Sequence, residues 1–193
     1  MSEIKLRNLE LKTFTGQDAI DYCQINNINP DNITELDLGF NQLTDISGIK
    51  LFKNLETLYL FKNKLKDITP VKDLKKMIRL HLSYNKIIDI SIIKYLNNLK
   101  WLSLDYNKIT DISVLKSLNN LQNLYIYNTK ITDITVIKNL KKLELLDIDN
   151  LGSESDQVQY INFLKNLEEL RCKKGFKDMS VINKLNKNIN IIK

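Results

Sequence analysis

The chain has 193 residues, of which 43% are hydrophobic and 27% charged, and this composition is typical of a soluble globular protein. No apolar run approaches the roughly 18 residues of a membrane span, and the opening residues lack the apolar core of a secretory signal, so we expect a cytoplasmic protein without membrane insertion. The formal net charge of +6 would suit contacts with nucleic-acid phosphates, but nearly all the basic residues are Lys, whereas base readout favours Arg, and no nucleic-acid partner is expected.

Residues 1–32 do not follow the pattern of the rest of the chain, and they predict an N-terminal cap with a helix. Thr15, followed three residues later by Asp18, is a typical helix start. Such a cap would cover the core edge of the unit that follows. The two cysteines, Cys23 and Cys172, cannot build a disulfide framework, and free thiols fit a reducing compartment.

The next part of the chain is a tandem repeat with a period of 22 residues, seen in the segments 55–63 (LETLYLFKN), 77–85 (MIRLHLSYN) and 99–107 (LKWLSLDYN). A fixed period of this length is typical of a solenoid, in which each unit contacts only its neighbours. We expect seven repeats over 33–188, irregular from residue 143, and a partial terminal strand over 189–193. The irregular units predict either a C-terminal cap or a local binding feature.

Each repeat has the same internal pattern. Apolar residues at its fourth and sixth positions predict a β-strand with one buried face, and stacked units would align these strands in a parallel sheet. An Asp-Ile pair follows, and its Asp predicts a cap for a short 3₁₀ or helical return segment. A metal-binding ladder is the alternative for these carboxylates, but oxygen-ligand sites need convergence from several directions, and no metal is expected.

The ninth position predicts a structural ladder of amides. An Asn side chain supplies both a donor and an acceptor, so it can satisfy backbone groups in its own turn and in the next. A buried polar group without a partner costs about 1–3 kcal/mol, which explains an amide rather than Leu at this position. The ladder residues are Asn41, Asn63, Asn85 and Asn107.

The pattern L-x-x-L-x-L-x-x-N-x-I-x-D-I-x-x-L-x-x-L resembles the leucine-rich repeat. Its short 22-residue form with Asp-Ile is similar to bacterial internalins and to the leucine-rich-repeat regulatory subunit of protein phosphatase 1. The resemblance implies an α/β fold: a curved right-handed solenoid with a parallel β-sheet on the concave face and 3₁₀ or helical segments on the convex side. It also implies a protein-binding module.

Side chains at the third, fifth and seventh positions of a repeat point away from the core, to the solvent side of the sheet. The single Trp and the single His of the chain lie there with several Tyr, and exposed aromatic side chains often mark interfaces. The alternative is that Tyr and Trp are ordinary strand formers. The predicted partner-binding residues are Tyr59, Phe61, Arg79, His81, Trp101, Asp105, Tyr125, Tyr127, Asp147 and Asp149.

We expect an apolar or aromatic anchor of the partner to lie across Tyr59, Trp101 and Tyr125. Basic groups of the same partner would then meet carboxylates at the flanks, by charge complementarity. The flanking residues are Glu35, Asp37, Asp147 and Asp149.

Catalysis has little support in this sequence. Stacking of the repeats would make Ser83, Ser103 and Asp105 neighbours of His81, which invites a catalytic-triad interpretation. An open sheet of rigid strands, however, offers no evident oxyanion hole. No nucleotide-binding or metal-binding motif occurs. We therefore expect a non-enzymatic protein without catalytic residues or cofactors.

The function predicted from these observations is recognition of a protein or peptide partner on the concave, aromatic-rich face. An intracellular adaptor or regulator is the first expectation, because the opening residues carry no signal sequence. A secreted or surface-attached, internalin-like protein that interacts with a host is the alternative. No oligomeric state is predicted.

Overall fold

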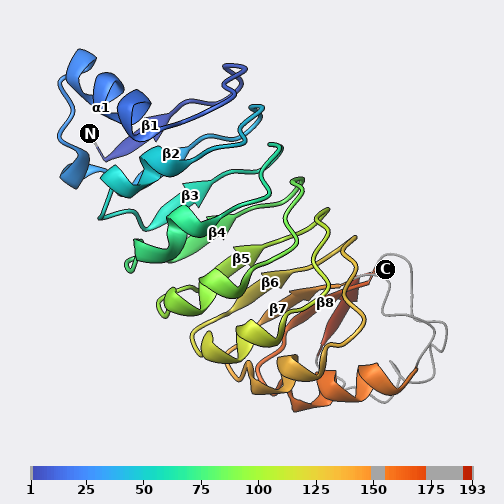
Figure 1. The fold of residues 1–193 in the computed structure, drawn as a ribbon. Helices are drawn as coiled ribbons and strands as arrows, with labels where there is room; N and C mark the ends of the chain where they lie inside the picture. The colour runs from blue at the N-terminus through green and yellow to red at the C-terminus, as the bar shows by residue number, and fades with distance from the viewer. Residues whose placement is uncertain (1, 149–154, 173–188, 193) are drawn as a thin grey trace.

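All strands of the computed structural model, which describes residues 2–148, 155–172 and 189–192, join one parallel sheet. Figure 1 shows the strands side by side along the molecule, with the 3₁₀ segments on one flank and helix α1 at the N-terminal end. The expected α/β solenoid is thereby confirmed. The strands follow chain order and are β1 (Glu3–Lys5), β2 (Glu35–Asp37), β3 (Thr57–Tyr59), β4 (Arg79–His81), β5 (Trp101–Ser103), β6 (Asn123–Tyr125), β7 (Leu145–Asp147), β8 (Glu169–Arg171) and β9 (Asn190–Ile192).

The core is built by the same apolar positions of successive repeats. The central residues Leu36, Leu58 and Leu80 pair in register on neighbouring strands, and all three are fully buried. Burial of one such side chain contributes roughly 1.5–3 kcal/mol. No single repeat encloses these side chains, so the core exists only because the units stack.

The return segments are 3₁₀ helices, and in η2 to η6 the recurring Asp accepts a hydrogen bond from the first N–H of the segment. Asp67 Oδ1 accepts a hydrogen bond of 2.7 Å from the N–H of Thr69, the first residue of its segment. The Asp lies one residue before the N-cap, Ile68, so it caps the segment from outside. The segments are η1 (Pro30–Asn32), η2 (Ser47–Leu51), η3 (Thr69–Asp73), η4 (Ser91–Tyr95), η5 (Ser113–Ser117), η6 (Thr135–Asn139) and η7 (Ser155–Phe163).

The ladder asparagines tie neighbouring turns together. The Nδ2 of Asn63 donates to the carbonyl of Leu60 in its own turn (3.1 Å) and to that of Leu38 in the preceding repeat (3.0 Å). Its Oδ1 accepts from the N–H of Leu43, also in the preceding repeat (2.9 Å). Asn63 therefore bonds its own turn and the turn of the preceding repeat. Bonds to the turn of the following repeat were expected from the sequence, and this expectation is wrong. The turn of the following repeat is in the same way bonded by its own Asn85 and by Asn107.

The N-terminal segment contains a strand that the sequence interpretation missed. Strand β1 pairs with β2, placing Ile4 beside Leu36, so part of residues 1–32 does follow the repeat. Helix α1 (Gly16–Ile25) then covers the position of a return segment, and it starts with a capping box between Thr15 and Asp18.

The irregular C-terminal part is described in pieces. Its longer return, η7, has nine residues. Strand β9 pairs with β8 and continues the sheet at the expected terminal strand. Residues 149–154 and 173–188, which include the predicted binding residue Asp149, lie outside the described residues. Among the described residues, no helix is long and apolar enough to cross a membrane.

Candidate binding face

The sheet gathers the predicted aromatic residues on its solvent side, which we call the concave face. The register places Tyr59 beside His81 and Arg79 beside Trp101, and Tyr125 lies one strand further on. Arg79 is exposed and the other four side chains are half-buried. These residues flank the buried centre of each strand, as the alternation of a strand requires.

Four rings form a continuous row, the ring row, made of Phe61, His81, Trp101 and Tyr125. Phe61 stacks on His81 with ring centres 4.7 Å apart. Trp101 meets His81 at 5.2 Å and Tyr125 at 5.0 Å. Such contacts contribute about 0.5–1.5 kcal/mol each beyond burial, so the rings hold one another in place.

Gly39 makes room for one end of this row. A Cβ atom at Gly39 would lie 2.6 Å from Cε1 of Phe61, which is too close for the ring to keep its place. The Phe61 ring therefore lies over bare backbone, and any larger residue at position 39 would displace it.

The chain has three arginines, and each lies over an aromatic ring on this face. The guanidinium carbon is 4.9 Å from the Phe61 ring centre for Arg7, 5.0 Å from that of Trp101 for Arg79, and 5.8 Å from that of Tyr125 for Arg171. Arg7 was not predicted, because the N-terminal segment was read as lying outside the repeat. The alternation of Ile4, Lys5 and Leu6 was the available signal.

His81 is neutral at pH 7. Burial, together with the positive charges of Arg79 and Arg7, lowers its pKa from 6.5 to about 4. Its Nε2 also lies 2.7 Å from Oγ of Ser83. The imidazole therefore behaves as one more aromatic ring of the row rather than as a cation.

The triad interpretation does not fit these contacts. Ser83 is only 4% exposed, so its hydroxyl is covered. Asp105 instead accepts from the hydroxyl of Ser103 (3.1 Å) and from the N–H of Tyr127 (2.8 Å). This carboxylate thus holds the turn of the next repeat, and a serine nucleophile open to a substrate is not found in this group.

Of the flanking carboxylates that the structure describes, Asp37 is already engaged within the chain, which makes it a poor site for basic groups of a partner. Asp37 is buried, accepts from the N–H of Gly39 (2.9 Å) and pairs with Arg7 (3.2 Å). Asp147 is also buried. The pKa of Glu35 is raised by burial and by the neighbouring Glu3.

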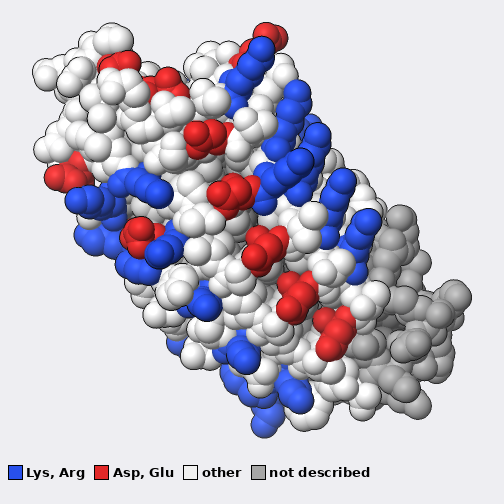
Figure 2. Space-filling model, viewed as in Figure 1, with Lys and Arg blue, Asp and Glu red and all other residues white. Residues whose placement is uncertain are grey.

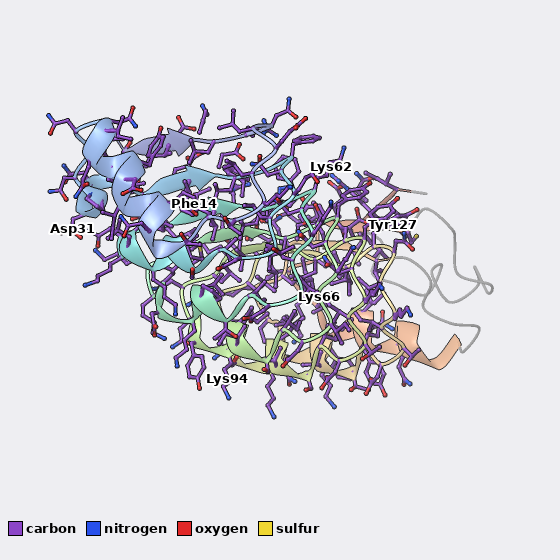
Figure 3. The ribbon with its side chains drawn as sticks, turned by 45° about the horizontal axis from the view of Figure 1, so that its top comes forward. Phe14, Asp31, Lys62, Lys66, Lys94 and Tyr127 are labelled. Carbon is purple, nitrogen blue, oxygen red and sulfur yellow. The ribbon has the colours of Figure 1, made fainter. Side chains whose placement is uncertain are left out.

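A second set of side chains lies beside the ring row, where the chain turns after each strand. We call it the edge column: Phe40, Lys62, Tyr84, Tyr106 and Tyr127. The Nζ of Lys62 lies 4.4 Å from the Phe40 ring centre, and Tyr84 stacks on Tyr106 at 4.1 Å. Tyr106 meets Tyr127 at 5.3 Å. Figure 3 shows Lys62 and Tyr127 along one edge of the solenoid, with Lys94 on the opposite side.

The first four members of the edge column have a left-handed backbone, with φ of 54° at Phe40, 53° at Lys62, 56° at Tyr84 and 53° at Tyr106. Asn128 has the same conformation at the corresponding position of the next repeat, with φ of 49°. Asn tolerates this region, whereas a bulky residue there is strained by about 1–2 kcal/mol.

A family model described as Leucine Rich repeats (2 copies) matches residues 31–76, 75–117 and 97–139, together more than half of the chain. The chain belongs to the leucine-rich-repeat family. Leucine-rich repeats are protein–protein interaction modules, and proteins of the family are typically non-enzymatic. No curated protein matches the chain in sequence.

Solved structures place this leucine-rich-repeat chain beside the internalins. Internalin C2 from Listeria monocytogenes has a TM-score of 0.79 and 29% identity, over 98% of this chain and 79% of that one. An internalin (inlF) from the same species has a TM-score of 0.74 and 28% identity, over 84% of this chain and 48% of that one. A leucine-rich-repeat protein from Leptospira interrogans has a TM-score of 0.75 and 26% identity, over 98% of this chain and 54% of that one. The chain thus spans about half the length of two of these proteins.

Proposed function

We propose that this leucine-rich-repeat chain binds a protein or peptide partner on its concave face, with Tyr59 and the ring row at the centre of the contact. The observation that carries the proposal is the continuity of the ring row across four repeats, half-buried and fixed by its own ring contacts. A surface that is already ordered loses little conformational entropy on binding. Trp, Tyr and Arg, which line it, are the side chains enriched at binding hot spots.

The role that we propose is that of an intracellular adaptor or regulator. Its support is the buried thiol of Cys23, which forms no disulfide and fits a reducing compartment. The second candidate is a secreted or surface-attached protein that contacts a host. The similarity to the Listeria internalin structures favours this second candidate.

Affinity capture from a lysate of the source organism tests the proposal. The wild-type chain is compared with the triple variant Tyr59→Ala/Trp101→Ala/Tyr125→Ala, and we expect a protein that only the wild type retains. A matched variant, Lys64→Ala/Lys86→Ala/Lys108→Ala, changes three exposed side chains on the turns and should capture as the wild type does.

Thermal unfolding by circular dichroism first establishes that both triple variants are folded. Equal capture by the wild type and the aromatic variant would contradict the concave-face proposal. Capture from a host extract but not from the organism's own lysate would favour the second candidate.

A further inference from the structure

Arg79 differs from the other two arginines of the concave face. Arg7 pairs with Asp37 at 3.2 Å, and Arg171 pairs with Glu169. Among the described residues, no carboxylate lies within ion-pair distance of Arg79, whose side chain is exposed. Arg79 is therefore the guanidinium whose hydrogen-bonding capacity remains for a ligand.

Its position is also fixed. The guanidinium carbon of Arg79 lies 5.0 Å from the centre of the Trp101 ring, on the neighbouring strand. A guanidinium packed on an aromatic face keeps its planar array of donors for a carboxylate, and part of the entropy of binding is already lost. On the other neighbouring strand, half-buried Tyr59 lies diagonally across from Arg79, since Arg79 pairs with Thr57 and Tyr59 pairs with His81.

Charges of both signs lie near Arg79, because Glu35, Asp37 and Glu3 raise the pKa of the neighbouring Tyr59 hydroxyl while Arg79 lowers it. Arg7 lies over the Phe61 ring, and the ring of His81, between Phe61 and Trp101, is uncharged at pH 7. The carboxylate of Asp37, which could oppose this charge, is buried and paired. In the middle of the ring row, the exposed guanidinium of Arg79 is therefore the group that can accept an anion, whereas the sequence analysis expected a basic partner.

We propose that the partner is a short acidic segment, which places a carboxylate on Arg79 and an adjoining aromatic or aliphatic side chain against Tyr59 and Trp101. This inference rests on the proposed function and adds the chemistry of the partner to it. The carboxylate accepts the two parallel hydrogen bonds that a guanidinium offers, and the apolar neighbour covers the rings beside it.

Selection from a displayed library of random 12-residue peptides tests this directly, with the immobilised wild type and Arg79→Gln as the two targets. We expect wild-type selection to enrich Asp or Glu next to Phe, Trp, Leu or Ile, and Arg79→Gln selection to lose the acidic residue. Arg79 is exposed, so the variant should fold, and its thermal unfolding checks this.

The selected peptide is then synthesised together with its Asp→Asn or Glu→Gln form. Trp101 is the only tryptophan of the chain, so its fluorescence reports binding at the proposed contact. We expect the amide form to bind at least ten-fold more weakly to the wild type but equally to Arg79→Gln, with Arg79→Lys in between. Lys108→Gln, an exposed lysine on a turn, should leave the affinity unchanged.

The outcomes separate the two proposals. If selected peptides change the Trp101 fluorescence but show no acidic preference, the acidic-segment inference is overturned and concave-face binding stands. If they bind without affecting Trp101, both fall. Enrichment of Lys and Arg, or no enrichment on the wild type, would overturn the inference of an acidic segment.

Discussion

One side chain in each of four repeats closes two turns at once. Asn85 donates to the carbonyls of Leu60 (2.9 Å) and Leu82 (3.0 Å) and accepts from the N–H of Leu65 (3.0 Å). Thr129 occupies the corresponding position after the ladder ends and makes a hydrogen bond of 3.0 Å to the carbonyl of Ile126. A hydroxyl is too short to span both turns as the amide does.

Asn85→Ala should lower the free energy of unfolding by about 3 kcal/mol, since it leaves a buried N–H and two carbonyls without this partner. Thr129→Ala, as the control, should cost about 1 kcal/mol. Urea denaturation followed by circular dichroism measures both. Equal losses in the two variants would show that bridging two turns adds nothing.

His81 should make stability depend on pH below neutrality. Its folded pKa of about 4 lies below the unfolded value of 6.5, so the unfolded chain binds more protons between these values and stability falls as the pH is lowered from 6.5 to 4. Because the ring is only half-buried, we expect a loss of about 1 kcal/mol between pH 7 and pH 5.

Urea midpoints at the two pH values, measured for the wild type and for His81→Gln, isolate this effect from the carboxylates. The variant should lose less stability on acidification than the wild type does. Identical pH dependence in the two proteins would argue against a neutral, buried imidazole.

At the scale of the elements, the N-terminal cap joins the first regular repeat through a close backbone approach. The N–H of Gly48 donates to the carbonyl of Phe14 at 2.7 Å, and Phe14 packs against Phe52 with ring centres 6.3 Å apart. Figure 3 labels Phe14 next to α1, at the N-terminal end of the solenoid. A Cβ at Gly48 would lie 2.3 Å from the carbonyl oxygen of Thr15.

Gly48→Ala should therefore destabilise the chain by about 2 kcal/mol, because the cap must move away from the first return segment. Gly16→Ala is the matched control: its Cβ would meet nothing within 4 Å, at the first position of α1, and its effect should be neutral or slightly stabilising. Urea unfolding of both variants decides. A loss in Gly16→Ala as large as in Gly48→Ala would count against the close-approach explanation.

The period of 22 residues was sufficient to predict the strands β2 to β6 and the return segments between them, since each repeat has its own apolar alternation and its own Asp. It was insufficient for β1, because Ile4 and the residue that it pairs with, Leu36, are 32 residues apart. The helix α1 within that interval lengthens the first unit. All four residues of the ring row were among the predicted binding residues. Arg7 was missed, because the strand β1 that precedes it was not predicted.

What the sequence could not supply was which charged groups are already paired. Arg7 lies in the segment that the sequence analysis placed outside the repeats, whereas Asp37 lies in the first repeat. Only the pairing of β1 with β2 brings the two side chains together. The lowered pKa of His81 likewise depends on burial and on two arginines from different strands or turns. The acidic segment that we propose as the partner is therefore opposite in charge to the one expected from the sequence.

At the scale of the whole molecule, a charged residue at one position of the repeat recurs in neighbouring repeats, so that charged side chains form lines along the solenoid. Figure 2 shows a line of acidic side chains along the solenoid with a line of basic ones beside it. Lysines recur on successive turns at Lys64, Lys86, Lys108 and Lys130, and all four are exposed. Strands are spaced by about 4.8 Å, well inside the Debye length at low salt, so the ammonium groups repel one another.

Stability should rise by about 1 kcal/mol when NaCl is raised from roughly 20 mM to 500 mM, because screening relieves this repulsion and that of the net charge of +6. Urea midpoints at the two salt concentrations measure it, and Lys86→Gln/Lys108→Gln should show a smaller increase. Stability that falls with added salt would mean that attractive pairs dominate the surface instead.

The left-handed turns of the edge column make a different kind of experiment informative. Phe40, Tyr84 and Tyr106 occupy a conformation that Asn128 adopts without the same strain. Laboratory evolution under heat alone should therefore replace these aromatic residues by Asn or Gly. Laboratory evolution under heat with simultaneous retention of the captured partner would spare any ring that the partner contacts, so the difference between the two evolved populations would map the extent of the interface.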